Sequence, residues 1–316
     1  MQKIRYIDLH CDSATESCNA GGGFAAFGGQ VNTDKLINSG CAAQCFALFT
    51  DGENAAADFE RFAAYYNAQI AVDPRFLPVE FFSDIERAEK EGRVAAILTV
   101  ENIGFLNGDC GGIKRLAAAG VKMASLVWNN ANAFAFPNLI FKDGVPDFAA
   151  REKRGLTKAG KEAAEELNSN RIIIDVSHLS DGGVEDLLGL SKDPIVASHS
   201  NCAAVCNVSR NLTDSQIKKI ADRGGVIGLN FCRDFIGGES AFDGLFAHLK
   251  HLLDVGGEDV LALGSDFDGI PPYDELYDCT FVQRLLQYFY DRGITGKQLE
   301  KLARGNFCRL FKEVVG

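Results

Sequence analysis

The feature that most constrains the fold of this chain is a regular alternation of β-rich runs with helical segments. Short apolar runs recur along almost the whole length, and segments with helical character separate them. Strands that alternate with helices favour parallel pairing, and near-continuous apolar strands indicate burial on both faces. The eight strand candidates are residues 4–12, 41–49, 93–101, 121–128, 171–178, 193–200, 225–231 and 259–268.

Eight such units in a chain of 316 residues predict an α/β fold, a closed (β/α)8 barrel of the TIM type, as a single domain over residues 1–316. An open doubly wound sheet is the alternative. Such a sheet usually carries a glycine-rich phosphate turn after its first strand, and HCDSATESC is not such a turn. Two long connections, 13–33 and 129–156, are expected to form lids, binding loops or partner contacts.

The segments between the strands have helical composition and recognisable ends. Thr157 and Thr213 are the expected N-caps of two of them. The segments are residues 57–72, 84–92, 111–120, 157–170, 213–225, 244–257 and 297–314.

Charge and composition exclude several classes of function. The 32 Lys and Arg residues against 43 Asp and Glu give a net charge of −11, so neither nucleic acid nor an anionic membrane surface is an expected partner. No apolar run approaches the roughly 18 residues that a membrane-spanning helix needs, and the first residues lack the apolar core of a signal peptide. The ten cysteines lie mostly in apolar runs, which is typical of buried reduced thiols. We therefore expect a cytoplasmic protein.

Polar side chains end several of the predicted strands. The carboxyl ends of barrel strands share one rim, where enzymes of this fold place their active sites. The residues are His10 and Asp12 on the first strand, Glu101 on the third, His178 on the fifth, His199 on the sixth, and Asp266 and Asp268 on the eighth.

The surrounding titratable residues receive less specific interpretations. Asp8, His10 and Asp12 occupy every second position of the first strand, so their side chains are expected to point to one face. Asp8 is expected to support the site or simply to be hydrogen-bonded. Asp268 has no clear role and is expected to be a satisfied loop carboxylate. His248 and His251 lie three residues apart and are expected on a solvated helix face rather than as a ligand pair.

Three histidines and at least two carboxylates at one rim form a nitrogen-and-oxygen ligand set. This set suits zinc, with manganese, iron or cobalt as alternatives. The candidates exceed the three protein ligands of a single catalytic zinc, and with one bridging carboxylate they suit two metal ions about 3.5–4 Å apart. The residues alone leave other interpretations open: Glu101 as a carboxylate exposed to water, and His178 and His199 as core histidines bonded to backbone.

Six blocks of the sequence resemble, in order, motifs of the renal (membrane) dipeptidase family of binuclear zinc peptidases. DLHCD resembles its first-strand D-x-H-x-D motif, and TVEN resembles the strand that carries a bridging glutamate. GLTKAGKEAAEELN with the following IIIDVSHLS, and then PIVASHSN, are similar to its two histidine strands. SRNLTD resembles an arginine motif and LGSDFDGI the last-strand aspartate motif. The resemblance covers nearly the whole chain and implies a barrel of the metal-dependent hydrolases.

Carried over residue by residue, the resemblance implies a ligand set for two zinc ions, or for other divalent metals. One metal would be bound by His10 and Asp12, the other by His178 and His199, and Glu101 would bridge them. Arg210 is expected to bind the C-terminal carboxylate of the substrate through its guanidinium fork. Asp266 is expected to move a proton between the attacking water and the leaving amine.

The activity that the resemblance implies is hydrolysis of short peptides with a free C-terminal carboxylate, including L,D-dipeptides, by a hydroxide that bridges the metals. The family is commonly dimeric. We therefore expect a homodimer, in which a partner could cover the apolar loop 133–148.

One block departs from the family pattern. Mammalian members carry a histidine in the fourth-strand motif that holds the substrate or its tetrahedral intermediate, whereas this chain reads SLVWNNAN with Trp128 at that position. Trp128 and Asn129 are the expected substrate contacts there, with Asn132 nearby. Indole can donate one hydrogen bond but cannot become a cation near neutral pH. An amidohydrolase-type enzyme for N-acyl amino acids, lactones or phosphoesters is therefore an alternative, as is a barrel that binds metal without catalysis.

Overall fold

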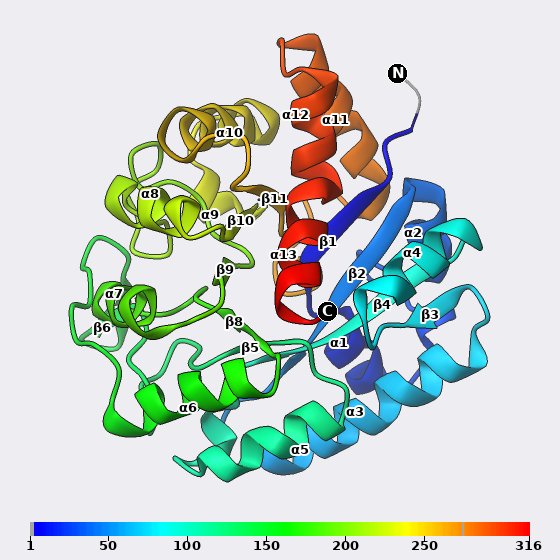
Figure 1. The fold of residues 1–316 in the computed structure, drawn as a ribbon. Coiled ribbons are helices and arrows are strands. Elements are labelled where there is room, and N and C mark those ends of the chain that lie inside the picture. The colour runs from blue at the N-terminus through cyan, green and yellow to red at the C-terminus, as the bar shows by residue number, and fades with distance from the viewer. Residues whose placement is uncertain (1–2, 274) are drawn as a thin grey trace.

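The computed structural model describes residues 3–273 and 275–316 and shows a closed barrel of eight parallel strands surrounded by helices (Figure 1). Around the barrel the order is β1, β2, β4, β5, β8, β9, β10 and β11, and β11 pairs with β1 to complete the ring. The barrel strands are β1 (Tyr6–Cys11), β2 (Cys41–Phe49), β4 (Val94–Glu101), β5 (Met123–Ser125), β8 (Ile173–Asp175), β9 (Val196–Ala197), β10 (Val226–Leu229) and β11 (Leu261–Leu263).

Each of the eight predicted runs contains one barrel strand, so the prediction of a closed (β/α)8 barrel is confirmed. The pairing of β2 with β4 closes the ring and excludes the open doubly wound alternative. Three short strands were not predicted. β3 (Phe76–Pro78) pairs with the start of β4, while β6 (Ile140–Lys142) and β7 (Val145–Asp147) form an antiparallel hairpin within the long 129–156 connection.

The helices cover the outside of the barrel. Thr157 and Thr213 cap α6 and α8 as predicted, because their hydroxyls accept the backbone N–H of Gly160 and Gln216. The helices are α1 (Ser13–Ala20), α2 (Thr33–Ser39), α3 (Ala55–Val72), α4 (Phe82–Lys90), α5 (Ile113–Ala118), α6 (Lys158–Ser169), α7 (Asp181–Leu190), α8 (Asp214–Asp222), α9 (Arg233–Ile236), α10 (Ala241–Gly256), α11 (Val282–Asp291), α12 (Gly296–Glu300) and α13 (Asn306–Val314). Of these, α1, α2, α7, α9 and α11 were not predicted.

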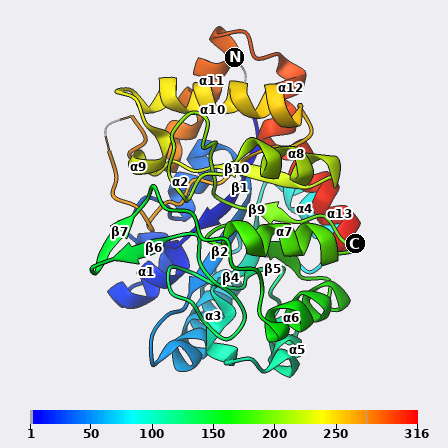
Figure 2. The ribbon, with the colours of Figure 1, turned by 90° about the vertical axis from the view of Figure 1, so that its left-hand side faces the viewer.

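The two ends of the barrel differ in chemistry. Apolar side chains from the first residues of several strands fill the amino end, where they pack against one face of α13. Figure 2 shows α13 and the C-terminus on one side of the molecule, and the β6–β7 hairpin, α1 and α9 on the other. Because α13 closes the amino end, a ligand can reach the barrel axis only from the carboxyl ends of the strands.

The first strand departs from the simple alternation that the sequence predicts. Asp8 pairs with Gln44 and Cys11 pairs with Phe46, so β1 advances by three residues over the length in which β2 advances by two. One extra residue in a strand is a β-bulge, and a bulge changes which residues share a face. The bulge lies just before the site, and it separates the directions of Asp8 and His10.

The prediction that Asp8, His10 and Asp12 share one face is therefore wrong for Asp8. Its carboxylate accepts a hydrogen bond from Gln44 Nε2 at 2.9 Å. It also accepts the backbone N–H of Ser265 at 2.8 Å and the Ser265 hydroxyl at 2.6 Å. Asp8 thus ties β1 to its two neighbouring strands as a fully hydrogen-bonded buried carboxylate.

The prediction of a solvated helix face is also wrong for His248. This residue is fully buried: its Nδ1 accepts the backbone N–H of Cys202 at 3.1 Å, and its Nε2 bonds the carbonyl of Ile236 at 2.9 Å. Helix α10 packs against both α8 and α9, so the side of α10 that carries His248 is covered. His251 is partly exposed and pairs with Asp214 at 2.7 Å. Neither histidine belongs to the cluster at the strand ends.

Candidate active site

The predicted rim residues converge at the carboxyl end of the barrel. Glu101 is the last residue of β4, and His10 is the penultimate residue of β1. His178 and Asp266 follow β8 and β11 in left-handed backbone conformations, with φ of 71° and 66°. Left-handed conformations cost energy for residues other than glycine and cluster at functional sites. His199 follows β9.

Glu101 stands between two groups of side chains. Its Oε1 lies 2.9 Å from Nε2 of His178 and 3.8 Å from Nε2 of His199. Its Oε2 lies 3.7 Å from Nε2 of His10. The two oxygens of one carboxylate therefore face different imidazoles, as a bridging ligand requires.

A second group of carboxylates surrounds His10. Its Nε2 lies 3.5 Å from Asp12 Oδ2 and 3.8 Å from Asp266 Oδ1. Possible ligand atoms within 4.8 Å of one another form two sets, one of His10, Glu101 and His199 and one of His10, Asp12 and Asp266. Asp266, predicted as a proton carrier, therefore also lies within reach of a cation at His10.

Hydrogen bonds behind two histidines fix which ring nitrogen faces the site. Nδ1 of His178 bonds Oδ1 of Asn129 at 2.9 Å. Nδ1 of His199 lies 2.7 Å from the Ser198 hydroxyl, which donates its own hydrogen to Asp175 at 2.5 Å. Both imidazoles therefore carry hydrogen on Nδ1, which leaves Nε2 with a lone pair. Such outer hydrogen bonds are typical of metal-binding histidines.

Burial keeps these two imidazoles neutral. Burial, together with the positive charges of Arg210 and His10, holds the pKa of His178 and of His199 well below the ordinary value. Their Nε2 atoms lie 3.1 Å apart, and Nη2 of Arg210 donates to Nε2 of His178 at 3.0 Å. Two Nε2 lone pairs that face each other at this distance repel unless a positive charge lies beside them. In this structure the guanidinium of Arg210 is that charge.

The charges around His10 have the opposite effect. Burial lowers the pKa of His10, but the carboxylates of Glu101, Asp12 and Asp266 outweigh burial and raise it to about 10. Burial raises the pKa of Glu101 well above its ordinary value, and it also raises the pKa of Asp266. Several buried carboxylates around one imidazole form an environment that favours positive charge.

The residues present fit a pair of divalent metal ions. Nε2 of His10 and Oδ1 of Asp12 are buried and have no hydrogen-bond partner within residues 3–273 and 275–316. Such atoms are costly unless a ligand or ion satisfies them. Gly269 keeps the adjacent space open, because a Cβ there would lie 2.2 Å from Asp12 Oδ2 and 2.9 Å from Asp266 Oδ1. Neutral imidazole nitrogens and carboxylate oxygens are ligands that zinc and related metals accept.

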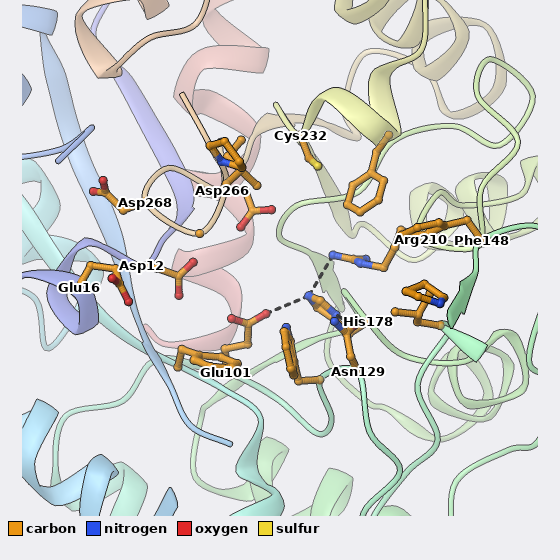
Figure 3. A pocket seen from close by; sticks show the side chains of 18 of the residues that line it. Asp12, Glu16, Glu101, Asn129, Phe148, His178, Arg210, Cys232, Asp266 and Asp268 are labelled. Carbon is orange, nitrogen blue, oxygen red and sulfur yellow. Dashed lines mark hydrogen bonds and ion pairs between the residues drawn. The ribbon is translucent and has the colours of Figure 1, made fainter. Parts of the chain in front are cut away.

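A cavity of about 620 Å³ opens above these residues, within the usual range for small-molecule sites (Figure 3). All the predicted substrate contacts, Arg210, Trp128 and Asn129, line it. Arg210 is 3% exposed, and in the described part of the chain its Nη1 has no hydrogen-bond partner. Trp128 packs edge-on against Phe49 at 4.8 Å between ring centres and lies 6.2 Å from His178.

Several residues of this site were not predicted. Asn230 donates to Asp266 Oδ2 at 3.1 Å, and Ser198 supports His199. Their only sequence signal is their place beside a strand end. Asp268 lines the cavity and accepts hydrogen bonds from Ser13 and from the backbone of Gln30, as expected for a satisfied loop carboxylate. Other lining residues that were not predicted are Glu16, Leu139, Phe141, Pro146, Phe148, Cys232, Phe235, Gly269, Ile270 and Pro271.

Comparison with known families identifies the group of proteins to which this site belongs. The model of the membrane dipeptidase family, peptidase family M19, matches residues 1–315. The chain belongs to this family. Membership in the membrane dipeptidase family makes the protein a hydrolase that acts on peptide bonds. This excludes the alternative of a barrel that binds metal without catalysis. Despite the family name, we find no helix among residues 3–273 and 275–316 with the length and apolar character to cross a bilayer.

Curated relatives and solved structures agree with this assignment. A Klebsiella pneumoniae protein, described as an uncharacterized protein in the pqqA 5′ region, is 35% identical over 244 residues, which are 73% of this chain and 86% of that protein. An uncharacterized dipeptidase of Schizosaccharomyces pombe is 31% identical over 228 residues, 70% of this chain and 53% of its own length.

Two solved metallopeptidase structures superpose on nearly the whole chain. The crystal structure of the dipeptidase AC, an M19 metallopeptidase, has a TM-score of 0.92 and 26% identity, with 100% of both chains covered. A metallopeptidase from Rhodobacter sphaeroides, liganded with a phosphinate mimic of the dipeptide L-Ala-D-Ala, has a TM-score of 0.90 and 24% identity, with 99% of this chain and 100% of that chain covered.

Proposed function

We propose that this protein is a zinc-dependent dipeptidase that holds two metal ions and hydrolyses short peptides with a free C-terminal carboxylate. The observation that carries the proposal is the position of Glu101, whose two oxygens face His10 on one side and His178 with His199 on the other. In this proposal Asp12 completes the shell on the His10 side. Divalent metal ions at such a site polarise the peptide carbonyl and make hydroxide available near neutral pH.

Asp266 is suited to move the proton in this reaction. Asn230 holds its Oδ2 at 3.1 Å, which fixes the carboxylate at the cavity wall. Burial raises its pKa, so the carboxyl group can accept and return a proton closer to neutral pH than an exposed aspartate. In the proposed reaction Asp266 takes a proton from the attacking water and delivers it to the leaving amine.

Arg210 is suited to select peptides with a free carboxyl end. Arg210 lines the cavity, and its buried Nη1 has no hydrogen-bond partner among the residues that the structure describes. A carboxylate can accept hydrogen bonds from two guanidinium nitrogens at once, and it would satisfy this atom.

Trp128 favours a second candidate function, the hydrolysis of N-acyl amino acids. Its indole lines the cavity 6.2 Å from His178, where it can stack on a substrate but cannot supply positive charge. An N-acyl amino acid offers the same carboxylate to Arg210 and an acyl group in place of the first residue. Substrate panels therefore need both dipeptides and N-acyl amino acids.

The test is metal removal and restoration with a dipeptide panel. We expect chelation to abolish cleavage of L-Ala-L-Ala or L-Ala-D-Ala, and added Zn²⁺ to restore it, with metal content measured in parallel. The L,D-dipeptide is included because the R. sphaeroides structure holds its mimic. Arg210→Ala should raise KM by about a hundredfold or more for substrates with a free carboxylate, since a buried charge-assisted pair is lost. Cleavage that is unchanged after metal removal, or cleavage of N-acyl amino acids without cleavage of dipeptides, would contradict the proposal.

Two further properties stay predictions. The ten cysteines have free thiols, which supports a reducing, cytoplasmic location. The expected homodimer can be measured by light scattering.

A further inference from the structure

Two phenylalanine rings lie beside Arg210 in the cavity wall. The guanidinium carbon of Arg210 lies 5.3 Å from the ring centre of Phe235, and the rings of Phe235 and Phe148 are 6.1 Å apart. Phe148 follows β7 of the hairpin, while Phe235 belongs to α9. Both line the cavity, and Figure 3 shows Phe148 next to Arg210.

The two sequence neighbours of Arg210 hold the backbone of both phenylalanines. The backbone N–H of Ser209 donates to the carbonyl of Phe148 at 2.6 Å. Nδ2 of Asn211 donates to the carbonyl of Phe235 at 2.8 Å. The backbone on either side of Arg210 is therefore tied to the backbone of both phenylalanines.

This loop is itself anchored from behind. Nη2 of Arg151 donates to the carbonyl of Asn211 at 3.0 Å, and Arg151 forms a two-pronged ion pair with Asp181 at 2.8 and 2.9 Å. Rigid positioning of this kind is what a recognition site needs, because little conformational entropy is lost on binding.

We propose that Phe148 and Phe235 form the subsite for the side chain of the substrate's C-terminal residue, so that dipeptides with a large apolar C-terminal residue are preferred. The inference rests on the proposed function, in which Arg210 binds the C-terminal carboxylate. In an amino acid the carboxylate and the side chain leave the same Cα. A carboxylate at Arg210 therefore brings the side chain to the adjoining rings.

The surroundings of the two rings support an apolar side chain. Leu139, which precedes the β6–β7 hairpin, and Pro146 of β7 also line the cavity. The carboxylates of Asp12, Glu16 and Asp268 lie on the far side of the cavity from Arg210 in Figure 3. Aromatic rings contribute both buried area and favourable ring contacts to an apolar or aromatic guest.

The first experiment compares Ala-Phe with Ala-Ala, with the C-terminal residue in L and in D form, on the zinc-loaded protein. We expect wild type to prefer Ala-Phe, and Phe235→Ala and Phe148→Ala each to reduce the ratio of kcat/KM values about tenfold, mainly through KM. Phe81→Ala is the matched control, since Phe81 is 46% exposed at the start of α4 and should leave the ratio unchanged. An equal loss on both substrates would show that the rings only position Arg210, and would overturn the inference.

A second measurement separates this inference from the proposed reaction. Trp128 is the only tryptophan of the chain and lines the same cavity, so its fluorescence reports ligands there. We expect free phenylalanine, a product of Ala-Phe cleavage, to bind more tightly than alanine, and Phe235→Ala to remove the difference. If no dipeptide is cleaved but this preference is present, the proposed reaction fails while the subsite stands. If dipeptides are cleaved and neither assay distinguishes phenylalanine from alanine, the subsite fails alone.

Discussion

His199 shows how much of this site depends on residues that never touch a ligand. Its Nδ1 bonds the Ser198 hydroxyl, and Ser198 donates to Asp175, whose other oxygen accepts two backbone N–H groups. Each step fixes the direction of the next hydrogen. The chain of bonds holds the Asp175 carboxylate with three donors and keeps Nε2 of His199 pointed at Glu101.

Removing the hydroxyl of Ser198 should therefore weaken metal binding. We expect Ser198→Ala to lower zinc affinity about 10- to 100-fold, because His199 loses the partner that orients its ring and selects its tautomer. Competition with a chromogenic chelator measures the affinity without reference to activity.

Ser200→Ala is the matched control for this measurement. Ser200 is buried two residues further along, and its hydroxyl reaches the Ser177 hydroxyl at 3.5 Å rather than an imidazole. Equal zinc affinities of Ser198→Ala and wild type would show that the hydroxyl does not prepare His199.

Among the elements, α13 decides which end of the barrel can bind a ligand. Phe307, Leu310 and Phe311 of this helix join the apolar cluster that fills the amino end of the barrel. The rings of Phe307 and Phe311 lie 5.7 Å apart, and both side chains are buried. With that end packed, polar side chains gather at the carboxyl end, where β-strands stop and water can enter.

Shortening a buried side chain of α13 should reduce the stability of the protein more than its activity. We expect Phe311→Ala to lower the free energy of unfolding by about 3–5 kcal/mol, since a fully buried ring leaves a cavity. Urea denaturation gives the value, and the exposed Phe81→Ala should change it by less than about 0.5 kcal/mol. A loss below about 1 kcal/mol for Phe311→Ala would mean that α13 does not close the barrel.

For the whole molecule, His248 links stability to pH. Burial lowers its pKa from the usual value to about 4, and the site accepts only the neutral ring because Nδ1 receives the N–H of Cys202. The unfolded chain binds a proton near pH 6.5, whereas the folded chain does not until about pH 4. Stability from this group is therefore complete above about pH 6.5 and falls as the pH drops toward 4.

The expected loss is about 3 kcal/mol between pH 6.5 and pH 4. Denaturation of metal-free protein at several pH values measures it, and His248→Gln should flatten the pH dependence by up to one proton relative to wild type. His251→Gln, at the partly exposed pair with Asp214, is the control. Parallel pH curves for wild type and His248→Gln would contradict this account.

The barrel could be predicted because its signal is repeated in every unit. Each strand is a run of buried residues bounded by polar ones, and eight weak local signals support one another. The five strand-end ligand candidates followed from the same logic, since parallel strands must bring their carboxyl ends to one rim. Helix α11 carries the apolar spacing of an amphipathic helix at Val282, Leu285, Leu286 and Phe289, and this signal could have identified it from the sequence. The β6–β7 hairpin has mostly exposed residues and gives no such signal.

By itself, the sequence determined the alternation of strands and helices, and with it the barrel and the rim, and it indicated His10, Asp12, Glu101, His178 and His199 as the ligand candidates there. These follow from local patterns that repeat along the chain. Only the tertiary structure decided that a bulge turns Asp8 away, that His248 is buried, and that Phe148 and Phe235 flank Arg210. Each of these depends on contacts between segments far apart in the chain, and no local pattern encodes which distant surface a side chain will meet.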